Sequence, residues 1–243
     1  MDLKDCSYED IAKMIDHALL VPTTNVTQLE QGCELAVAYN VASVCIMPYY
    51  LRRCAELLEG STVLPSTVIG FPLGGHATST KVAEAKQAIE DGCQELDMVA
   101  NISQVLSEKW GYVRDDLKAV IELAHAANRK VKVIFENCYL EDEHKTKLCE
   151  ICGELNADWV KTSTGFGTGG ATLPDLELMR KHTPDHVQVK AAGGVRDVET
   201  IMKVCAIPAT RIGTSSTKKL LDDVRERMGL EPIEVADTTV GGY

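Results

Sequence analysis

Aromatic side chains are scarce in this sequence: Phe, Trp and Tyr make up 5% of its 243 residues, whereas hydrophobic residues of all kinds make up 45%. A core with so few rings is built mainly from Val, Ile, Leu and Ala. Such residues pack well between helices and a parallel sheet, whereas the core of a β-sandwich depends more on large aromatic residues. The composition therefore favours an α/β architecture with helix–sheet layers.

An excess of positive charge is also missing. The chain has 25 Lys and Arg against 36 Asp and Glu, which gives a formal net charge of −11 at pH 7. Proteins that bind nucleic acid neutralise its phosphates with a basic face. We therefore expect no nucleic-acid partner, and a phosphate on a small substrate would have to be held by a local group of donors.

Long apolar runs and a leader segment are the next absences. The longest apolar runs, such as 41–47, have the length of a strand and fall far short of the roughly 18 residues that span a bilayer. The opening residues mix both charges and contain no basic segment followed by an apolar one. We expect no membrane contact and a cytoplasmic location.

The nine cysteines do not form the even-numbered framework that staples small secreted domains. Cys149 and Cys152 have the spacing of half a zinc site, and His182 and His186 could supply the other half. The gap between the two pairs is more than twice the usual spacing of about 12–15 residues. Both cysteines also fall in a helical pattern over 142–155. We expect packed, reduced thiols there, with no metal and no cofactor.

Short β-rich runs alternate with amphipathic helical stretches along the whole chain. The predicted strands cover 15–19, 42–46, 67–69, 95–99, 130–135, 159–162, 188–191 and 211–213. The predicted helices cover 26–39, 49–58, 81–91, 112–127, 142–155, 174–181, 197–204 and 216–228. An extra helix over 8–14 opens the chain, because Ser7 and Asp10 have a capping-box-like spacing.

Eight strand–helix units predict a single closed (β/α)8 barrel, or TIM barrel, a fold that typically takes about 250 residues. The whole chain, 1–243, would form one domain with a C-terminal tail from about 229. An open doubly wound sheet has the same local patterns, and only the count of eight strands separates the two folds.

Charged residues interrupt these apolar strands. Asp16, Asp97, Lys132, Lys161 and Lys190 lie inside the first, fourth, fifth, sixth and seventh predicted strands. A single strand lysine can reach solvent or pair with a carboxylate. Lysines that face inward on neighbouring strands would instead lower one another's pKa through burial and like charge. A neutral lysine amine attacks carbonyl groups, which predicts Schiff-base chemistry, with Asp97 as a group to move protons.

A glycine-rich turn follows the sixth predicted strand. Gly165, Gly167 and Gly170 match the spacing of a dinucleotide-binding fingerprint. The context disagrees, because the next strand ends at Lys190 and supplies no acidic residue for a ribose. A nucleotide-binding oxidoreductase is therefore the weaker interpretation.

Two further turns follow the seventh and eighth predicted strands. They contain Gly193, Gly194, Gly213, Ser215 and Ser216. Barrel enzymes often bind phosphate with these two loops and the N-terminus of a helix. Either loop alone could be a tight turn with serine caps, but both together, beside strand lysines, indicate a phosphate site.

These residues resemble the deoxyribose-phosphate aldolases, class I enzymes that use a lysine and no metal. The resemblance rests on the segments 15–17, 70–72, 95–97, 160–165, 190–196 and 213–216. It implies that Lys161 forms an imine with the substrate while Asp97 and Lys190 relay protons through water. The expected reaction is the reversible cleavage of 2-deoxy-D-ribose 5-phosphate to acetaldehyde and D-glyceraldehyde 3-phosphate.

The resemblance also places other residues near the substrate. Asp16 and Cys45 would lie beside it, Thr164 and Gly165 would belong to the phosphate site, and we expect Lys132 in the same positive pocket. In some members of the family a C-terminal tyrosine reaches the active site, which suggests a similar contact for Tyr243. A homodimer is the expected assembly.

Three positions depart from the pattern of the family. Phe166 stands where some members have a lysine, and Ala18 and Val21 stand where many have a threonine and a lysine. These changes remove one possible phosphate contact, one hydroxyl and one charge. A phosphosugar isomerase or epimerase on the same barrel stays as the alternative function, because it would share the phosphate loops without the imine.

Overall fold

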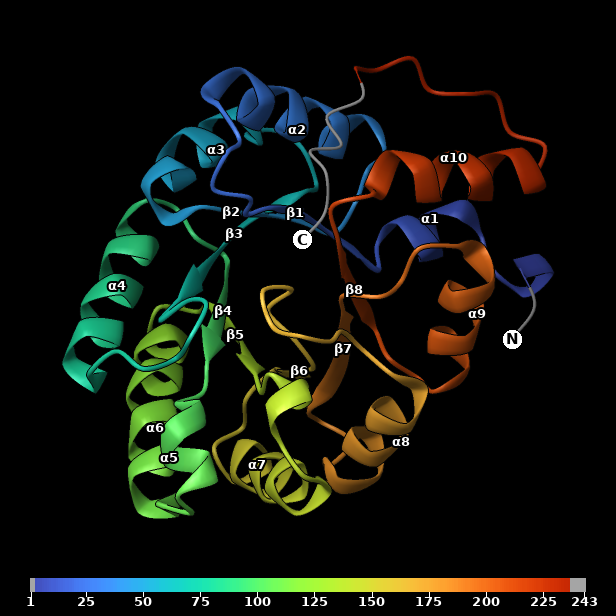
Figure 1. Cartoon of the computed structure of the whole chain (residues 1–243). Coiled ribbons are helices and arrows are strands. Elements are labelled where there is room, and N and C mark those ends of the chain that lie inside the picture. The colour runs from blue at the N-terminus through green and yellow to red at the C-terminus, as the bar shows by residue number, and fades with distance from the viewer. Residues whose placement is uncertain (1–2, 237–243) are drawn as a thin grey trace.

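The computed structural model describes residues 3–236, and in this part of the chain eight parallel strands follow one another in order around a closed barrel. Figure 1 looks into this ring, which closes where β8 pairs with β1. The strands are β1 (Ile15–Leu19), β2 (Ser43–Ile46), β3 (Leu64–Ile69), β4 (Glu95–Val99), β5 (Lys130–Ile134), β6 (Trp159–Lys161), β7 (Gln188–Ala192) and β8 (Arg211–Thr214). The expected TIM barrel is confirmed, and the open sheet is ruled out.

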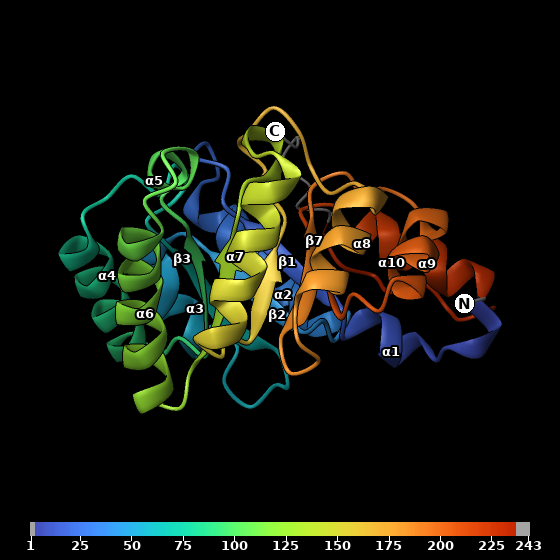
Figure 2. The same cartoon turned by 90° about the horizontal axis from the view of Figure 1, so that it is seen from below.

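Helices surround the barrel on the outside, and Figures 1 and 2 show them as an outer ring. They are α1 (Tyr8–Ala12), α2 (Val26–Ala38), α3 (Leu51–Leu57), α4 (Thr78–Glu90), α5 (Ile102–Leu106), α6 (Trp110–Ala126), α7 (Asp142–Glu154), α8 (Leu173–His182), α9 (Val198–Ala206) and α10 (Thr217–Arg227). Three short 3-10 turns are η1 (Leu3–Asp5), η2 (Pro48–Tyr50) and η3 (Asn137–Tyr139). Within the described residues, no helix is both long and apolar enough to cross a membrane.

The element boundaries differ from the sequence predictions in a few places. Strand β3 begins at Leu64, three residues before the predicted start, although it contains Pro65. Proline lacks an N–H group, but the Pro65 carbonyl still accepts a bond from Gln94 N at 2.8 Å. The short helix α5 was not predicted. The opening helix was predicted correctly, and Ser7 and Asp10 form the expected capping box.

The barrel wall separates an apolar layer from a polar interior. In β5, Val131 and Val133 belong to the hydrophobic core, whereas Lys132 between them bonds to carboxylates from other strands. In β7, Val189 and Ala191 belong to the same core, and Lys190 contacts Asp97 across the barrel. Successive residues of a strand point to opposite faces. The period of two therefore delivers these lysines to the inside of the barrel.

Candidate active site

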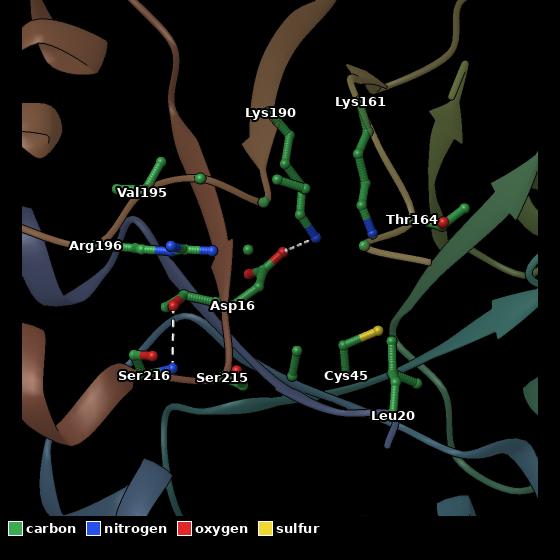
Figure 3. Close-up of a pocket in the computed structure, with 17 residues that line it drawn as sticks. Asp16, Leu20, Cys45, Lys161, Thr164, Lys190, Val195, Arg196, Ser215 and Ser216 are labelled. Atoms are coloured by element: carbon green, nitrogen blue, oxygen red, sulfur yellow. Dashed lines mark hydrogen bonds and ion pairs between the residues drawn. The ribbon is translucent and has the colours of Figure 1, made fainter. Parts of the chain in front are cut away.

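A pocket lies at the carboxyl ends of the strands and collects most of the predicted site residues (Figure 3). Lys161 and Lys190 both line it, and their amines lie side by side. The other predicted residues that line it are Asp16, Cys45, Thr164, Gly165, Gly193, Gly194, Gly213, Ser215 and Ser216. This is the end at which barrel enzymes build their active sites.

Asp97 connects the lysines at the bottom of the pocket. Its Oδ2 atom accepts a bond from Lys161 Nζ at 2.7 Å and from Lys190 Nζ at 2.8 Å. Its other oxygen accepts from Lys132 Nζ at 2.8 Å. A carboxylate accepts several hydrogen bonds through its two oxygens, so Asp97 joins three lysines at once.

Strand register explains why the two pocket lysines meet. Lys161 of β6 lies directly beside Lys190 of β7 in the parallel ladder, and neighbouring strands are about 4.8 Å apart. Both side chains therefore extend inward at the same height. The sequence prediction of two adjacent inward lysines is confirmed.

Lys132 does not lie where we expected it. Register pairs it with Trp159, two residues before Lys161, so its side chain starts one layer deeper in the barrel. Its amine contacts Asp16 at 3.1 Å and Glu95 at 2.6 Å in addition to Asp97, and it does not line the pocket. Burial disfavours its charge, but these carboxylates outweigh burial and raise the pKa of Lys132 well above its ordinary value. The structure thus places Lys132 as a buried cation beneath the pocket and not in its lining, where we expected it.

Among the described residues, the centre of the barrel holds one more cationic side chain than carboxylates. The charged side chains are Lys132, Lys161, Lys190 and Arg211 against Asp16, Glu95 and Asp97. A buried net charge is costly, so the cluster favours loss of one proton. Burial lowers the pKa of Lys190, and the charges of Lys132 and Lys161 add to this effect against the attraction of Asp16 and Asp97.

Asp16 holds the second side of Lys190. Its Oδ2 atom is 2.5 Å from Lys190 Nζ, while its Oδ1 atom accepts from Ser43 Oγ at 2.7 Å and Arg211 Nη1 at 2.6 Å. Burial opposes its ionisation, but Lys132, Lys190 and Arg211 together hold the pKa of Asp16 well below its ordinary value. Asp16 is therefore an ionised anchor that fixes the position of the Lys190 amine.

The other end of the pocket offers backbone donors and a cation. Helix α10 starts at Thr217, and Ser216 occupies its N-cap position without a side-chain cap bond. The Ser216 amide instead donates to Thr214 Oγ1 at 3.0 Å, so Ser216 does not cap this helix through its hydroxyl. Uncapped N–H groups and the helix dipole favour an anion at this place.

Arg196 lines the same end of the pocket and was not among the predicted site residues. In Figure 3 it extends from the loop after β7 toward the pocket, on the side of Ser215 and Ser216. Its position directly after the predicted glycine turn was the available signal. Leu20 and Cys45 lie across from it, and burial raises the pKa of Cys45, so that wall is apolar and uncharged.

The glycine-rich turn after β6 has a packing role. A Cβ atom on Gly170 would lie 2.6 Å from the carbonyl carbon of Gly193, so glycine is needed where this loop meets the loop after β7. Gly165 and Gly193 also have positive φ angles of 91° and 74°, which favour glycine. With a closed barrel around it, the turn does not have the Rossmann context of a dinucleotide fingerprint, so the oxidoreductase interpretation loses the motif on which it rested.

The cysteine pair is a packing feature, as expected. Cys149 and Cys152 are both buried in α7, where Cys149 Sγ lies 3.8 Å from the Met179 carbonyl oxygen. Across residues 3–236, no three or more His, Cys, Asp or Glu side chains gather where they could hold a metal ion. Tyr243, the predicted tail contact, lies outside the described residues.

Comparisons with known proteins match this site and fold. A model of the DeoC/LacD family of aldolases matches residues 1–221. The deoxyribose-phosphate aldolase of Rhodopirellula baltica is 59% identical over 241 residues, which cover 99% of this chain and 100% of that protein. The one from Thermococcus gammatolerans is 45% identical over 89% of this chain and 97% of its own.

Solved structures agree with the sequence relatives. The aldolase QR15 superposes with a TM-score of 0.85 at 38% identity and covers 91% of this chain and 99% of its own. A tetrameric deoxyribose phosphate aldolase from Aeropyrum pernix superposes with a TM-score of 0.83 at 31% identity and covers 91% of this chain and 93% of its own. This chain belongs to the DeoC/LacD family of aldolases.

Proposed function

We propose that this chain is a deoxyribose-phosphate aldolase, which reversibly cleaves 2-deoxy-D-ribose 5-phosphate to acetaldehyde and D-glyceraldehyde 3-phosphate. The observation that carries the proposal is the pair of lysine amines on one Asp97 oxygen, at 2.7 and 2.8 Å, in the same pocket as an uncapped helix N-terminus. The family and the curated relatives support an aldolase. The substrate suits a pocket with a nucleophile at one end and anion donors at the other.

Lys161 is the proposed nucleophile. Its neutral amine attacks the C1 aldehyde carbon of the open-chain sugar, and loss of water leaves an iminium ion between Nζ and C1. Lys161 contacts Asp97 and lines the pocket, whereas Lys132 is enclosed by three carboxylates. Lys161 is therefore the better placed of the two for a bulky covalent adduct.

Cleavage of the C2–C3 bond follows from the iminium. The C3 hydroxyl loses its proton, its oxygen electrons form the carbonyl of D-glyceraldehyde 3-phosphate, and the C2–C3 electron pair becomes the C1–C2 double bond of an enamine on Lys161. Protonation of C2 and addition of water then release acetaldehyde and the free amine. Asp97 and Lys190 are the proposed relay for these protons, since Lys161 and Lys190 contact the same Asp97 oxygen.

The phosphate end orients the sugar. The turns with Gly193 and Gly194, the start of α10 and Arg196 line the part of the pocket that we assign to the phosphate. Binding energy from this remote group holds C1 near the amine. The protein carries a net charge of −11, so its attraction for a phosphate is local to this pocket.

Borohydride trapping tests this function. Reduction of the protein together with 2-deoxyribose 5-phosphate, followed by peptide mass analysis, is expected to give a stable adduct on the peptide that contains Lys161. Lys161→Leu should lose the adduct, while Lys118→Leu, at an exposed position of α6, should keep it. An isomerase on the same barrel would yield no lysine adduct, and that result would refute the proposal.

Two further expectations concern the whole protein. We propose a homodimer, which light scattering of the purified protein can test, and a tetramer or a monomer would refute it. We also propose a cytoplasmic location, which fractionation of the source cells can test.

A further inference from the structure

Glu136 is a buried carboxylate that does not line the pocket and is not one of the residues in the proposed mechanism. It follows β5 directly after Phe135, is 1% exposed, and has a left-handed backbone with φ 60° and ψ 63°. Left-handed backbone is uncommon for a residue other than glycine, and it is tolerated where neighbouring contacts hold it in place. The contacts of Glu136 therefore indicate its use.

Its carboxylate reaches the turn that follows β6. Thr164 N donates to both oxygens, at 3.2 Å and 3.3 Å, and the Thr164 hydroxyl donates to Oε2. The hydroxyl oxygen in turn accepts from Phe166 N at 2.9 Å. Because this amide occupies the acceptor side of the hydroxyl, the hydroxyl proton points at the carboxylate. One carboxylate thus orients two residues of the turn.

The same turn packs tightly against this side chain. A Cβ atom on Gly167 would lie 3.0 Å from Glu136 Cδ. On either side of Glu136 the backbone continues the ladder to β6, because Phe135 N bonds to Lys161 O at 3.0 Å and Asn137 N bonds to Thr162 O at 2.9 Å. Glu136 is therefore held between two bonds to the segment that carries Lys161.

We propose that Glu136 is a positioning residue that fixes the turn of Thr164, Gly165 and Phe166 as one wall of the substrate pocket. Thr164 and Gly165 line the pocket beside Lys161, whereas Glu136 does not line it. The Lys161 amine is held separately by Asp97. Glu136 thus affects how the sugar phosphate is bound in the pocket. Formation of the imine depends instead on Lys161 and Asp97.

This inference rests on the proposed function. Experiments with two substrates distinguish a failure of the inference from a failure of the proposed function. 2-Deoxyribose 5-phosphate needs the whole pocket, whereas acetaldehyde needs only the Lys161 amine to form an imine. In Glu136→Gln an amide nitrogen, which is a donor, replaces one carboxylate oxygen. It then faces a donor of Thr164, so that hydrogen bond is lost. We expect KM for the sugar phosphate to rise at least about tenfold, because one charge-assisted hydrogen bond is lost. Borohydride trapping of acetaldehyde on Lys161 should change less than about twofold.

Variants of the partner test the same contact. Thr164→Val removes the hydroxyl and should raise KM for the sugar phosphate as Glu136→Gln does. Thr164→Ser keeps the hydroxyl and should raise this KM less. The double variant Glu136→Gln with Thr164→Val should cost less than the two single losses combined, because both remove one interaction. Glu141→Gln, an exposed glutamate in the segment before α7, is the matched control and should behave as wild type.

The outcomes divide clearly. If Glu136→Gln lowers acetaldehyde trapping as strongly as it affects the sugar phosphate, or if the two losses add fully, Glu136 does not act through the turn and the inference is refuted. If instead the wild-type protein gives no adduct with either substrate, the proposed function itself fails.

Discussion

Lys161 and Lys190 are direct neighbours on β6 and β7, and their amines donate to the same oxygen of Asp97, at 2.7 and 2.8 Å. Two amines on one carboxylate oxygen lie close enough together for the proposed relay to pass a proton between them. Burial lowers the pKa of Lys190, so this lysine can give up a proton. In the proposed mechanism, the nucleophile Lys161 and the proton relay of Asp97 and Lys190 therefore lie within one small cluster.

Replacement of Asp97 tests this relay. Asp97→Asn keeps the shape of the side chain but replaces the carboxylate with a neutral amide. The amide cannot carry a proton between the lysines. We expect kcat for cleavage to fall on the order of 100- to 10,000-fold, the usual contribution of general acid–base catalysis. Steady-state kinetics measures this, and circular dichroism checks the fold. A loss below about threefold would show that Asp97 is only structural.

Lys132 gives a prediction about stability. Lys132→Met removes a fully buried cation that contacts Asp16, Glu95 and Asp97, at 3.1, 2.6 and 2.8 Å. Breaking a buried ion pair on one side costs about 3–5 kcal/mol, and we expect a loss of that size in the free energy of unfolding by denaturant. A stable Lys132→Met variant with only a raised KM would return Lys132 to the substrate site.

The fold and the pocket lysines were predictable from the sequence because strand periodicity is local. The alternation in β5 and β7 is enough to place Lys132 and Lys190 on the inner face. Depth inside the barrel was not predictable in the same way. Lys132 lies below Lys161 because β5 and β6 are staggered in register, and register depends on how all the strands close the ring.

The missed residues share a different physical reason. Arg196 and Glu136 act from loops, and their roles depend on where each loop folds back. Glu136 carried one weak signal, a charged residue directly after a buried strand. Its contact with Thr164 crosses to the next βα unit, which no local pattern indicates. The residues alone indicated Asp97 as a group that moves protons, whereas the resemblance to a family supplied the choice of Lys161 as the imine lysine and the relay role of Lys190.

Arg196 leads to a prediction about the phosphate. Among residues 3–236 it is the one arginine that lines the pocket, and it lies on the side of Ser215 and Ser216. Arg196→Gln should raise KM for 2-deoxyribose 5-phosphate about tenfold, because a hydrogen bond to a charged group contributes about 1.5–3 kcal/mol. The kinetics of unphosphorylated 2-deoxyribose should stay unchanged. An equal rise in KM for both sugars would mean that Arg196 does not bind the phosphate.

His17 predicts how stability depends on pH. It is buried on β1, where its Nδ1 atom lies 2.8 Å from the hydroxyl of Thr217 at the start of α10. Burial lowers the pKa of His17 from 6.5 to about 4. The unfolded chain therefore takes up this proton first as the pH falls. The contribution of His17 is complete above pH 6.5 and is lost progressively down to about pH 4.

Unfolding by denaturant between pH 4.5 and 7 measures this contribution, which amounts to about 3 kcal/mol for a shift of this size. His17→Asn keeps a hydrogen-bonding group for Thr217 but cannot titrate, so the free energy of unfolding of this variant should vary less over the same range. His125→Asn, an exposed histidine on α6, should leave most of the wild-type slope in place. If His17→Asn and the wild type lose stability in parallel from pH 7 to 4.5, another group is responsible, and His17 does not hold its neutral form against protonation.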